Sequence, residues 1–134
     1  MKFFVVIFLG IFINCFTQPI WQIANKSFKD CCENGNFTKY DYLKYCNFDF
    51  RSIEVINEFI DEMDMEEFDI YHKCFFASKN QTTCCLERGM TEFCANACDA
   101  TKPLELVSEL NECNYEPARL CGQGANLADP EEKK

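Results

Sequence analysis

The sequence is poor in the residue types from which most catalytic and metal sites are built. Its 134 residues include a single histidine, His72, and 13 basic residues against 22 acidic ones. Structural zinc sites combine paired cysteines with histidines, and this sequence offers one CxxxC unit and one histidine, so a zinc site is not expected. The acidic charge argues against nucleic acid and anionic membrane surfaces as partners, because both would repel this chain.

Long apolar segments and strand-like patterns are also missing. No stretch alternates apolar and polar residues between hairpin turns, which argues against a β-sheet. The one long apolar run, residues 3–13 behind Lys2, is typical of a secretory signal peptide and too short to span a bilayer. An uncleaved membrane anchor would need about 20 apolar residues. We therefore expect residues 1–17 to be a signal peptide, cleaved after Thr17 or a few residues later, and the protein to be secreted and extracellular.

Cysteine, in contrast, is abundant. Cys15 leaves with the signal peptide, and the even number that remains is typical of disulfide-linked domains in oxidising compartments. A core of about ninety residues is small, so disulfides are expected to decide whether the domain folds. Each closed loop of about 15 residues contributes about 3 kcal/mol. The cysteines expected to form disulfides are Cys31, Cys32, Cys46, Cys74, Cys84, Cys85, Cys94, Cys98, Cys113 and Cys121.

The cysteines fall in two similar blocks, CCENGNFTKYDYLKYC at residues 31–46 and CCLERGMTEFCANAC at residues 84–98. Adjacent cysteines, and cysteines one helical turn apart such as Cys94 and Cys98, are poorly placed to bond to each other. We therefore expect each member of such a pair to bond to a different element. The similarity of the blocks predicts a domain built from two degenerate repeats.

Aligning the two halves predicts one of the disulfides. Tyr42 falls opposite Cys94, and residues 63–66 fall opposite Cys113. The first half therefore lacks two cysteines that the second half has. Because an unpaired thiol is a liability in an oxidising compartment, the simplest account is that a bonded pair was lost together. The resulting hypothesis is that Cys94 pairs with Cys113.

Apolar residues spaced three and four apart predict short helices along most of the mature chain, and the expected fold class is a small, disulfide-rich all-α module. Asp64 and Glu67 form a capping-box pattern, and Ser52, Thr91 and Pro103 each suit a helix start. The expected helices cover residues 39–47, 52–63 and 103–114, a segment starting at Met65, another after Thr91, and a last turn at 117–121.

The two ends of the mature chain are expected to lie outside this helical domain. Residues 18–30 show no clear periodicity and are predicted to be an N-terminal arm. Residues 122–134 carry little apolar content and are predicted to be a mobile acidic tail. The expected cysteine-rich domain therefore spans residues 31–121.

The candidate sites are glycosylation sequons, not catalytic groups. The N-x-S/T sequences at Asn25, Asn36 and Asn80 predict glycosylation of at least one of them. His72 is predicted to be a structural or surface residue, since no serine or free thiol is placed by the sequence to use it as a base. The acidic run at residues 61–69 lacks the glycine and alternating ligands of an EF-hand and is predicted to be a solvated face. No catalytic, cofactor-binding or metal-binding residue is expected.

A family resemblance follows from the cysteine spacing. The two CC blocks, the CxxxC of the second block, the CNFD sequence beginning at Cys46 and the closing Cys113 and Cys121 resemble the DB module, a cysteine-rich extracellular domain of nematode secreted proteins. The resemblance covers residues 31–121. The family pattern has twelve cysteines, so this chain resembles a ten-cysteine variant that lacks one bonded pair. The family is of unknown function, and the resemblance implies an architecture and a compartment but no active residues.

Two non-enzymatic functions remain open. The first is an extracellular protein-interaction module, suggested by a cross-linked fold that carries no catalytic constellation. The alternative is a carrier of a lipid or other small apolar ligand, because disulfide-linked helical bundles rich in phenylalanine can enclose a cavity between helices. A continuous apolar cavity in the core would favour the carrier. The oligomeric state stays open.

Overall fold

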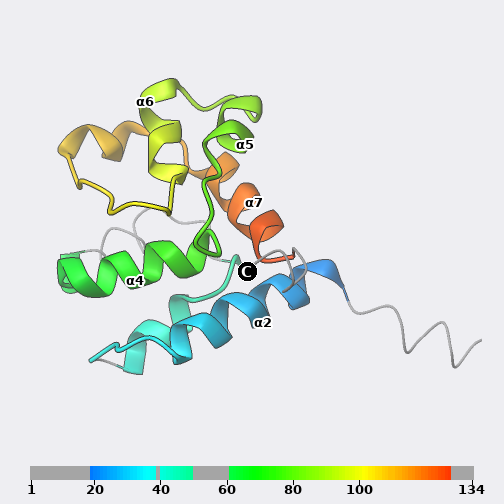
Figure 1. The fold of residues 1–134 in the computed structure, drawn as a ribbon, viewed down its shortest axis with the longest axis vertical. Coiled ribbons are helices and arrows are strands. Elements are labelled where there is room, and N and C mark those ends of the chain that lie inside the picture. The colour runs from blue at the N-terminus through cyan, green and yellow to red at the C-terminus, as the bar shows by residue number, and fades with distance from the viewer. Residues whose placement is uncertain (1–18, 39, 50–60, 128–134) are drawn as a thin grey trace, which may run out of the picture.

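The computed structural model describes residues 19–38, 40–49 and 61–127 of the chain (Figure 1). Across these ranges the chain forms helices and no β-strand, which confirms the predicted all-α class. None of the helices described is long and apolar enough to cross a membrane. The elements are α2 (Ile20–Glu33), the 3-10 helix η1 (Tyr40–Tyr45), α4 (Met65–Phe75), α5 (Thr82–Glu87), α6 (Glu92–Ala95), the 3-10 helices η2 (Asn96–Cys98) and η3 (Ser108–Glu112), and α7 (Glu116–Ala125).

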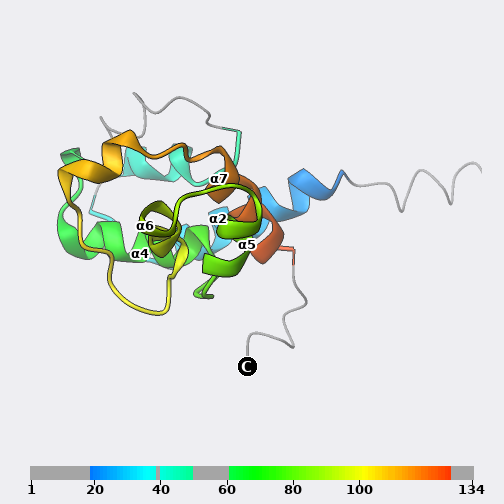
Figure 2. The ribbon, with the colours of Figure 1, turned by 90° about the horizontal axis from the view of Figure 1, so that it is seen from above.

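The helices form two groups (Figures 1 and 2). In the first group α2 packs against α4 and η1, and in the second α5 packs against α6, η2 and α7. Helix α7 also packs against α2, so the last of the described helices contacts the first. This contact joins the two groups.

The prediction that residues 18–30 form an N-terminal arm needs correction. Helix α2 occupies most of this segment and continues to Glu33. Ala24, Phe28 and Cys32 lie on one face at a spacing of four, and each is fully buried. This apolar stripe is only one residue wide, and the polar residues around it hide the helical period. The burial comes from packing against α4 and α7, which no local pattern records.

The helix starts predicted at Asp64 and Thr91 are confirmed. The Asp64 carboxylate accepts a hydrogen bond from the backbone N–H of Glu67 at 2.8 Å, and the Thr91 hydroxyl accepts one from the N–H of Cys94 at 3.3 Å. The segment predicted at residues 39–47 forms η1, a 3-10 helix. The helix predicted at residues 52–63 falls almost wholly within residues 50–60, outside the part of the chain that the structure describes.

The buried Glu67 departs from the predicted capping box. In a full box its carboxylate would return to the N-cap N–H. Here its Oε1 accepts hydrogen bonds from the backbone N–H and the hydroxyl of Thr38, both at 2.6 Å. The carboxylate thus ties the turn after α2 to the first turn of α4, and it does not belong to the solvated face predicted for the acidic run. Asp61, Glu62, Asp64 and Glu66 are exposed as predicted.

The prediction of a helix over residues 103–114 also needs correction. The chain is irregular up to Val107, and only the 3-10 helix η3 follows. The apolar residues here, Leu104, Val107, Leu110 and Cys113, are spaced by three throughout, which matches the three residues per turn of a 3-10 helix and drifts around an α-helix. Leu110 and Cys113 are buried, whereas Val107 is exposed.

Helix α7 extends beyond the predicted last turn. Pro117 lies in its first turn as expected, but the helix runs on to Ala125, so the tail does not begin at residue 122. Gly122 is required at its position, because a Cβ there would lie 2.6 Å from Cε1 of Phe75. The side-chain amide of Asn126 then donates to the carbonyls of Cys74 and Phe75 at 3.2 and 2.9 Å. Residues 128–134 of the predicted tail lie outside the described residues.

Candidate functional site

The structure joins the ten predicted cysteines in five disulfides. No adjacent pair bonds to itself, and Cys94 and Cys98 bond to different partners, as the spacing predicted. Within each half the first cysteine bonds to the last, and the second bonds to the cysteine that closes its block, Cys46 or Cys98. The bridges are Cys31–Cys74 and Cys32–Cys46 in the first half, and Cys84–Cys121 and Cys85–Cys98 in the second. Two duplicated units would give this pairing, and the duplication itself stays a prediction.

The fifth bridge joins Cys94 to Cys113, the pairing that alignment of the two halves predicted. At the aligned position in the first half, Tyr42 is almost fully buried and packs against Met63. Its hydroxyl donates a hydrogen bond to the carbonyl oxygen of Glu62 at 2.7 Å. A phenol and a methionine therefore connect the same parts of the first half that a disulfide connects in the second.

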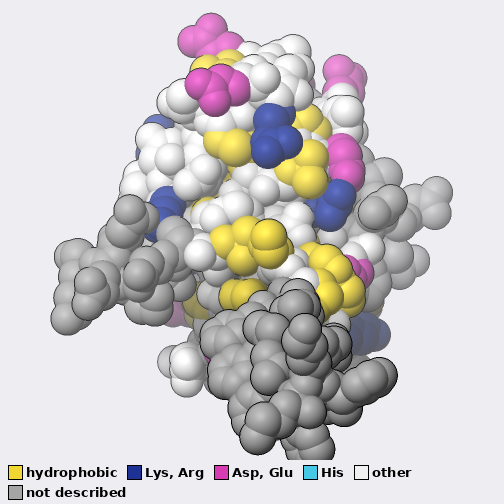
Figure 3. All heavy atoms as spheres, turned by 90° about the vertical axis from the view of Figure 1, so that its right-hand side faces the viewer, with side chains coloured by type: hydrophobic (Ala, Val, Ile, Leu, Met, Phe, Trp, Pro, Cys, Tyr) yellow, Lys and Arg dark blue, Asp and Glu magenta, His cyan; other side chains and the backbone are white. Residues whose placement is uncertain are grey.

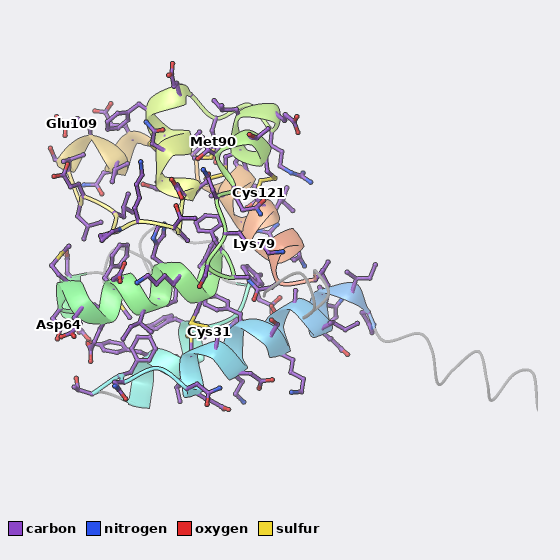
Figure 4. All side chains as sticks on the ribbon, viewed as in Figure 1. Cys31, Asp64, Lys79, Met90, Glu109 and Cys121 are labelled. Atoms are coloured by element: carbon purple, nitrogen blue, oxygen red, sulfur yellow. A yellow bond between two sulfur atoms is a disulfide. The ribbon has the colours of Figure 1, made fainter. Side chains whose placement is uncertain are left out.

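A cavity of about 820 Å³ lies between α4 and the segment 104–119. Phe68, His72 and Phe76, spaced by four on one face of α4, form one wall of it, and Leu104 and Leu110 belong to the other. The space reaches the surface, because Met65, Leu106 and Val107 line it and are exposed. Figure 4 shows side chains on both sides of α4, including the side that faces this segment. The lining is mostly apolar, as in sites for small ligands.

His72 is the one buried titratable side chain in that wall. Its ring lies parallel to the ring of Phe68, 6.2 Å away, and edge-on to that of Phe76 at 5.5 Å. Nε2 is 2.7 Å from the carbonyl oxygen of Ala97, so it carries a proton and donates it. Nδ1 is buried and has no hydrogen-bond partner. Burial lowers the pKa of the imidazole below its usual value of 6.5, with the bond to Ala97 opposing this, so the ring is neutral at pH 7.

The sequence predicted that His72 is structural or at the surface, and the structure places it in the core. What the sequence reasoning missed is its position in a cavity wall. One signal was available: Phe68, His72 and Phe76 recur at a spacing of four, with the histidine in the middle. Within the described residues no group of three or more His, Cys, Asp or Glu side chains is placed to hold a metal ion.

The three sequons have different environments. The side chains of Asn36 and Asn80 are exposed. Asn25 lies within α2 and is half-buried, and its Oδ1 accepts a hydrogen bond from the N–H of Phe48 at 2.8 Å. Its Nδ2 donates to the carboxylate of Asp49 at 3.3 Å. The amide that a glycan would modify at Asn25 is therefore already engaged in the fold.

Short helices, five disulfides and a small apolar core define the class of protein: a disulfide-rich helical module. The model of the DB module family matches residues 31–126, and the chain belongs to this family. The match includes all of α7, beyond the boundary at residue 121 that the sequence suggested. The DB module is not a known enzyme family. No curated protein and no solved structure matches the chain.

Proposed function

We propose that this DB module is a secreted, non-enzymatic binding protein that holds a small apolar ligand in the cavity between α4 and the segment 104–119. The volume of about 820 Å³ carries the proposal. It falls within the roughly 300 to 1,000 Å³ of typical ligand sites. Aromatic and aliphatic walls give such a site affinity through the burial of apolar surface.

The covalent framework supports both the compartment and the function. Ten paired cysteines suit an oxidising compartment, in line with the signal peptide proposed at residues 1–17. Cys94–Cys113 ties α6 to the end of η3, beside Leu110. The wall opposite α4 is thereby cross-linked, so a cavity can persist without a ligand to support it.

The test is uptake of an environment-sensitive apolar fluorophore by delipidated protein. We expect saturable binding with one site per chain. Val107→Trp would narrow the cavity from its exposed rim and should weaken binding at least tenfold. Leu86→Trp is the matched control, because Leu86 lies outside the cavity on α5 and is exposed to the same extent, 42% against 41% for Val107. Absence of saturable binding, or equal loss in both variants, would contradict the proposal.

A second candidate function is binding to an extracellular protein through the first turns of α2. Ile20, Trp21 and Ile23 are 64%, 48% and 45% exposed there, an unusual cluster for a small acidic domain. Figure 3 looks onto the side of the molecule from which this end of α2 emerges, and apolar side chains are visible on it. Tryptophan in such a cluster is typical of residues that dominate a protein interface.

This candidate is tested by affinity capture from extracellular fluid. We expect the wild-type protein to retain a saturable partner that Trp21→Ser loses and that Val107→Trp retains. Capture that Trp21→Ser leaves unchanged would assign the contact to another surface. The two candidates are thus separated by variants that lie on different sides of the fold.

A further inference from the structure

The charges around the cavity indicate which end group its ligand carries. Residues 61–72, on the α4 side, include no lysine or arginine, and residues 103–118, on the opposite side, include none either. The exposed acidic residues of these two segments are Asp61, Glu62, Asp64, Glu66, Glu105, Glu109, Glu112 and Glu116. In Figure 4 Asp64 and Glu109, one from each segment, both lie toward the left edge of the molecule. Both segments that enclose the cavity are therefore acidic.

The two lysines at the borders of these segments do not balance this charge. Lys73 Nζ lies 2.6 Å from a carboxylate oxygen of Asp69, and Lys102 Nζ lies 3.8 Å from one of Asp99. Each lysine is thus paired with a carboxylate that is not among the exposed ones. The surplus of negative charge on the two segments remains.

The residues that line the cavity show the same imbalance. Arg119 is the one lysine or arginine among the described lining residues, and its guanidinium donates to both carboxylate oxygens of Glu116 and to the carbonyl of Phe48. This pair cancels in charge. Asp61 also lines the cavity and is exposed, so its carboxylate gives the lining a net negative charge at the surface.

We propose, building on the ligand-binding function above, that the ligand is a cationic amphiphile of the long-chain amine class. Its chain occupies the apolar cavity, and its ammonium group stays at the opening, where Met65 and Leu106 are exposed beside Glu66 and Glu105. Opposite charges attract there more strongly than in bulk water, because protein lowers the effective dielectric constant. A fatty acid is a worse fit, since the same carboxylates repel its ionised end group. The cavity is the binding site, and the carboxylates select the end group.

Three probes of equal chain length test this in the wild-type protein: dodecylammonium, dodecanol and dodecanoate. Each competes with the uncharged apolar fluorophore at neutral pH, below the concentration at which it forms micelles. At about 0.01 M salt we expect dodecylammonium to bind about three- to tenfold more tightly than dodecanol, and dodecanoate to bind most weakly. At about 1 M salt the Debye length falls to about 3 Å, so the ratio of ammonium to alcohol affinities should approach one.

A matched pair of variants separates the charge at the cavity from the charge of the whole chain. Asp61→Lys reverses a charge on the lining, and Glu87→Lys makes the same change at an exposed position on α5, outside the cavity. At about 0.1 M salt, where the Debye length is about 10 Å, Asp61→Lys should lower the ratio of ammonium to alcohol affinities about threefold. Glu87→Lys should change it less than about twofold. Because the probes are compared in the wild type, the inference is tested even if a variant does not fold.

The outcomes separate this inference from the function beneath it. Equal affinities for dodecylammonium and dodecanol at low salt, or tighter binding of dodecanoate, overturn the cationic class and leave a carrier of another ligand. Dodecylammonium binding that Val107→Trp leaves unchanged would be adsorption to the acidic surface and would also overturn it. Equal effects of Asp61→Lys and Glu87→Lys overturn selection at the cavity. If neither the fluorophore nor any probe binds, the ligand-binding function itself fails and the inference fails with it.

Discussion

The two halves of the module reach a stable core by different means. The first half buries rings: Phe28 contacts Phe48, Tyr71 and Phe75 with centroids 4.9 to 5.6 Å apart. The second half buries alanine and sulfur, with no aromatic ring from its own sequence among the fully buried side chains of the described residues. The first half has two internal bridges and the second has three.

This difference shows that a buried aromatic core and disulfide bridges are alternative sources of stability for the folded domain. A buried aromatic ring removes some 150 to 250 Å² from water, and an alanine removes far less. A disulfide gives its stability mainly by restricting the unfolded chain, and it needs no bulky neighbours. The half that lacks large side chains therefore depends on bridges, and the half with one bridge fewer relies on the packing of Tyr42 and its neighbours.

The largest effect is expected from removing the ring at the centre of the first half. Phe28 is fully buried among three other rings, so Phe28→Ala should lower the free energy of unfolding by about 4 kcal/mol. Urea unfolding measures the change. Leu86→Ala on the exposed face of α5 is the control and should change it by less than about 0.5 kcal/mol. A small loss in Phe28→Ala would show that the bridges alone hold this half.

The next effect compares the two halves at their aligned position. The double variant Cys94→Ala/Cys113→Ala lacks the disulfide between residues 19 apart in the sequence. Its free energy of unfolding should be about 3 kcal/mol lower. Tyr42→Phe removes one hydrogen bond to Glu62 and should lower it by about 1 kcal/mol. Urea unfolding measures both changes. If Tyr42→Phe lowers the free energy of unfolding as much as removal of the disulfide does, packing of the ring is not the main contribution of Tyr42.

A smaller effect concerns the contact between the halves, made by His72 and Ala97. The folded state lowers the pKa of His72, so the unfolded chain takes up a proton first as the pH falls. The contribution of neutral His72 to the free energy of unfolding is fully present above about pH 6.5. It is lost as the pH falls from there toward the lower pKa of the folded state. We expect the free energy of unfolding, measured by urea, to be lower at about pH 5.5 than at about pH 7.5. His72→Gln should lack this part of the decline, and an unchanged decline would assign it to other groups.

The smallest effect on stability is expected from substitutions at the predicted glycosylation sites. Asn36→Gln and Asn80→Gln should each remove one glycan mass from protein secreted by eukaryotic cells, with a change in stability below about 0.5 kcal/mol. Asn25→Gln should remove no glycan mass, because its amide is held by Phe48 and Asp49. Intact-protein mass spectrometry gives the answer. A glycan found at Asn25 would show that modification precedes the packing of α2.

Sequence patterns predicted the features that local chemistry and covalent bonding determine. The caps at Asp64 and Thr91 follow from side chains within three residues of the bond they make. The Cys94–Cys113 bridge followed from the need to leave no thiol unpaired. Such constraints can be read from the sequence because they involve few residues and have few alternatives.

The features that were missed depend on contacts across the fold. Residues 20–30 are helical with Ala24 and Phe28 buried against other elements, and α7 passes close to Phe75 at Gly122, a contact that the sequence does not show. Leu104 and Val107 belong to a period of three, which predicts an α-helix poorly and matches the observed 3-10 helix η3. The sequence suggested that a cavity could exist but not where it lies, because its two walls are about thirty residues apart in the chain and no pattern within either wall records the other.

The nesting of the bridges has a consequence for the order in which the chain can be oxidised. Cys32 and Cys85 bond to cysteines 14 and 13 residues further along the chain. The partners of the neighbouring Cys31 and Cys84 lie 43 and 37 residues further along, so they are synthesised later. During vectorial synthesis each inner loop can close while the adjacent thiol is still unpaired. Cys84 then meets Cys94 and Cys98 before Cys121 has been made. Correct pairing of Cys84 with Cys121 therefore requires either that earlier wrong disulfides are reshuffled or that Cys84 stays reduced until Cys121 is available.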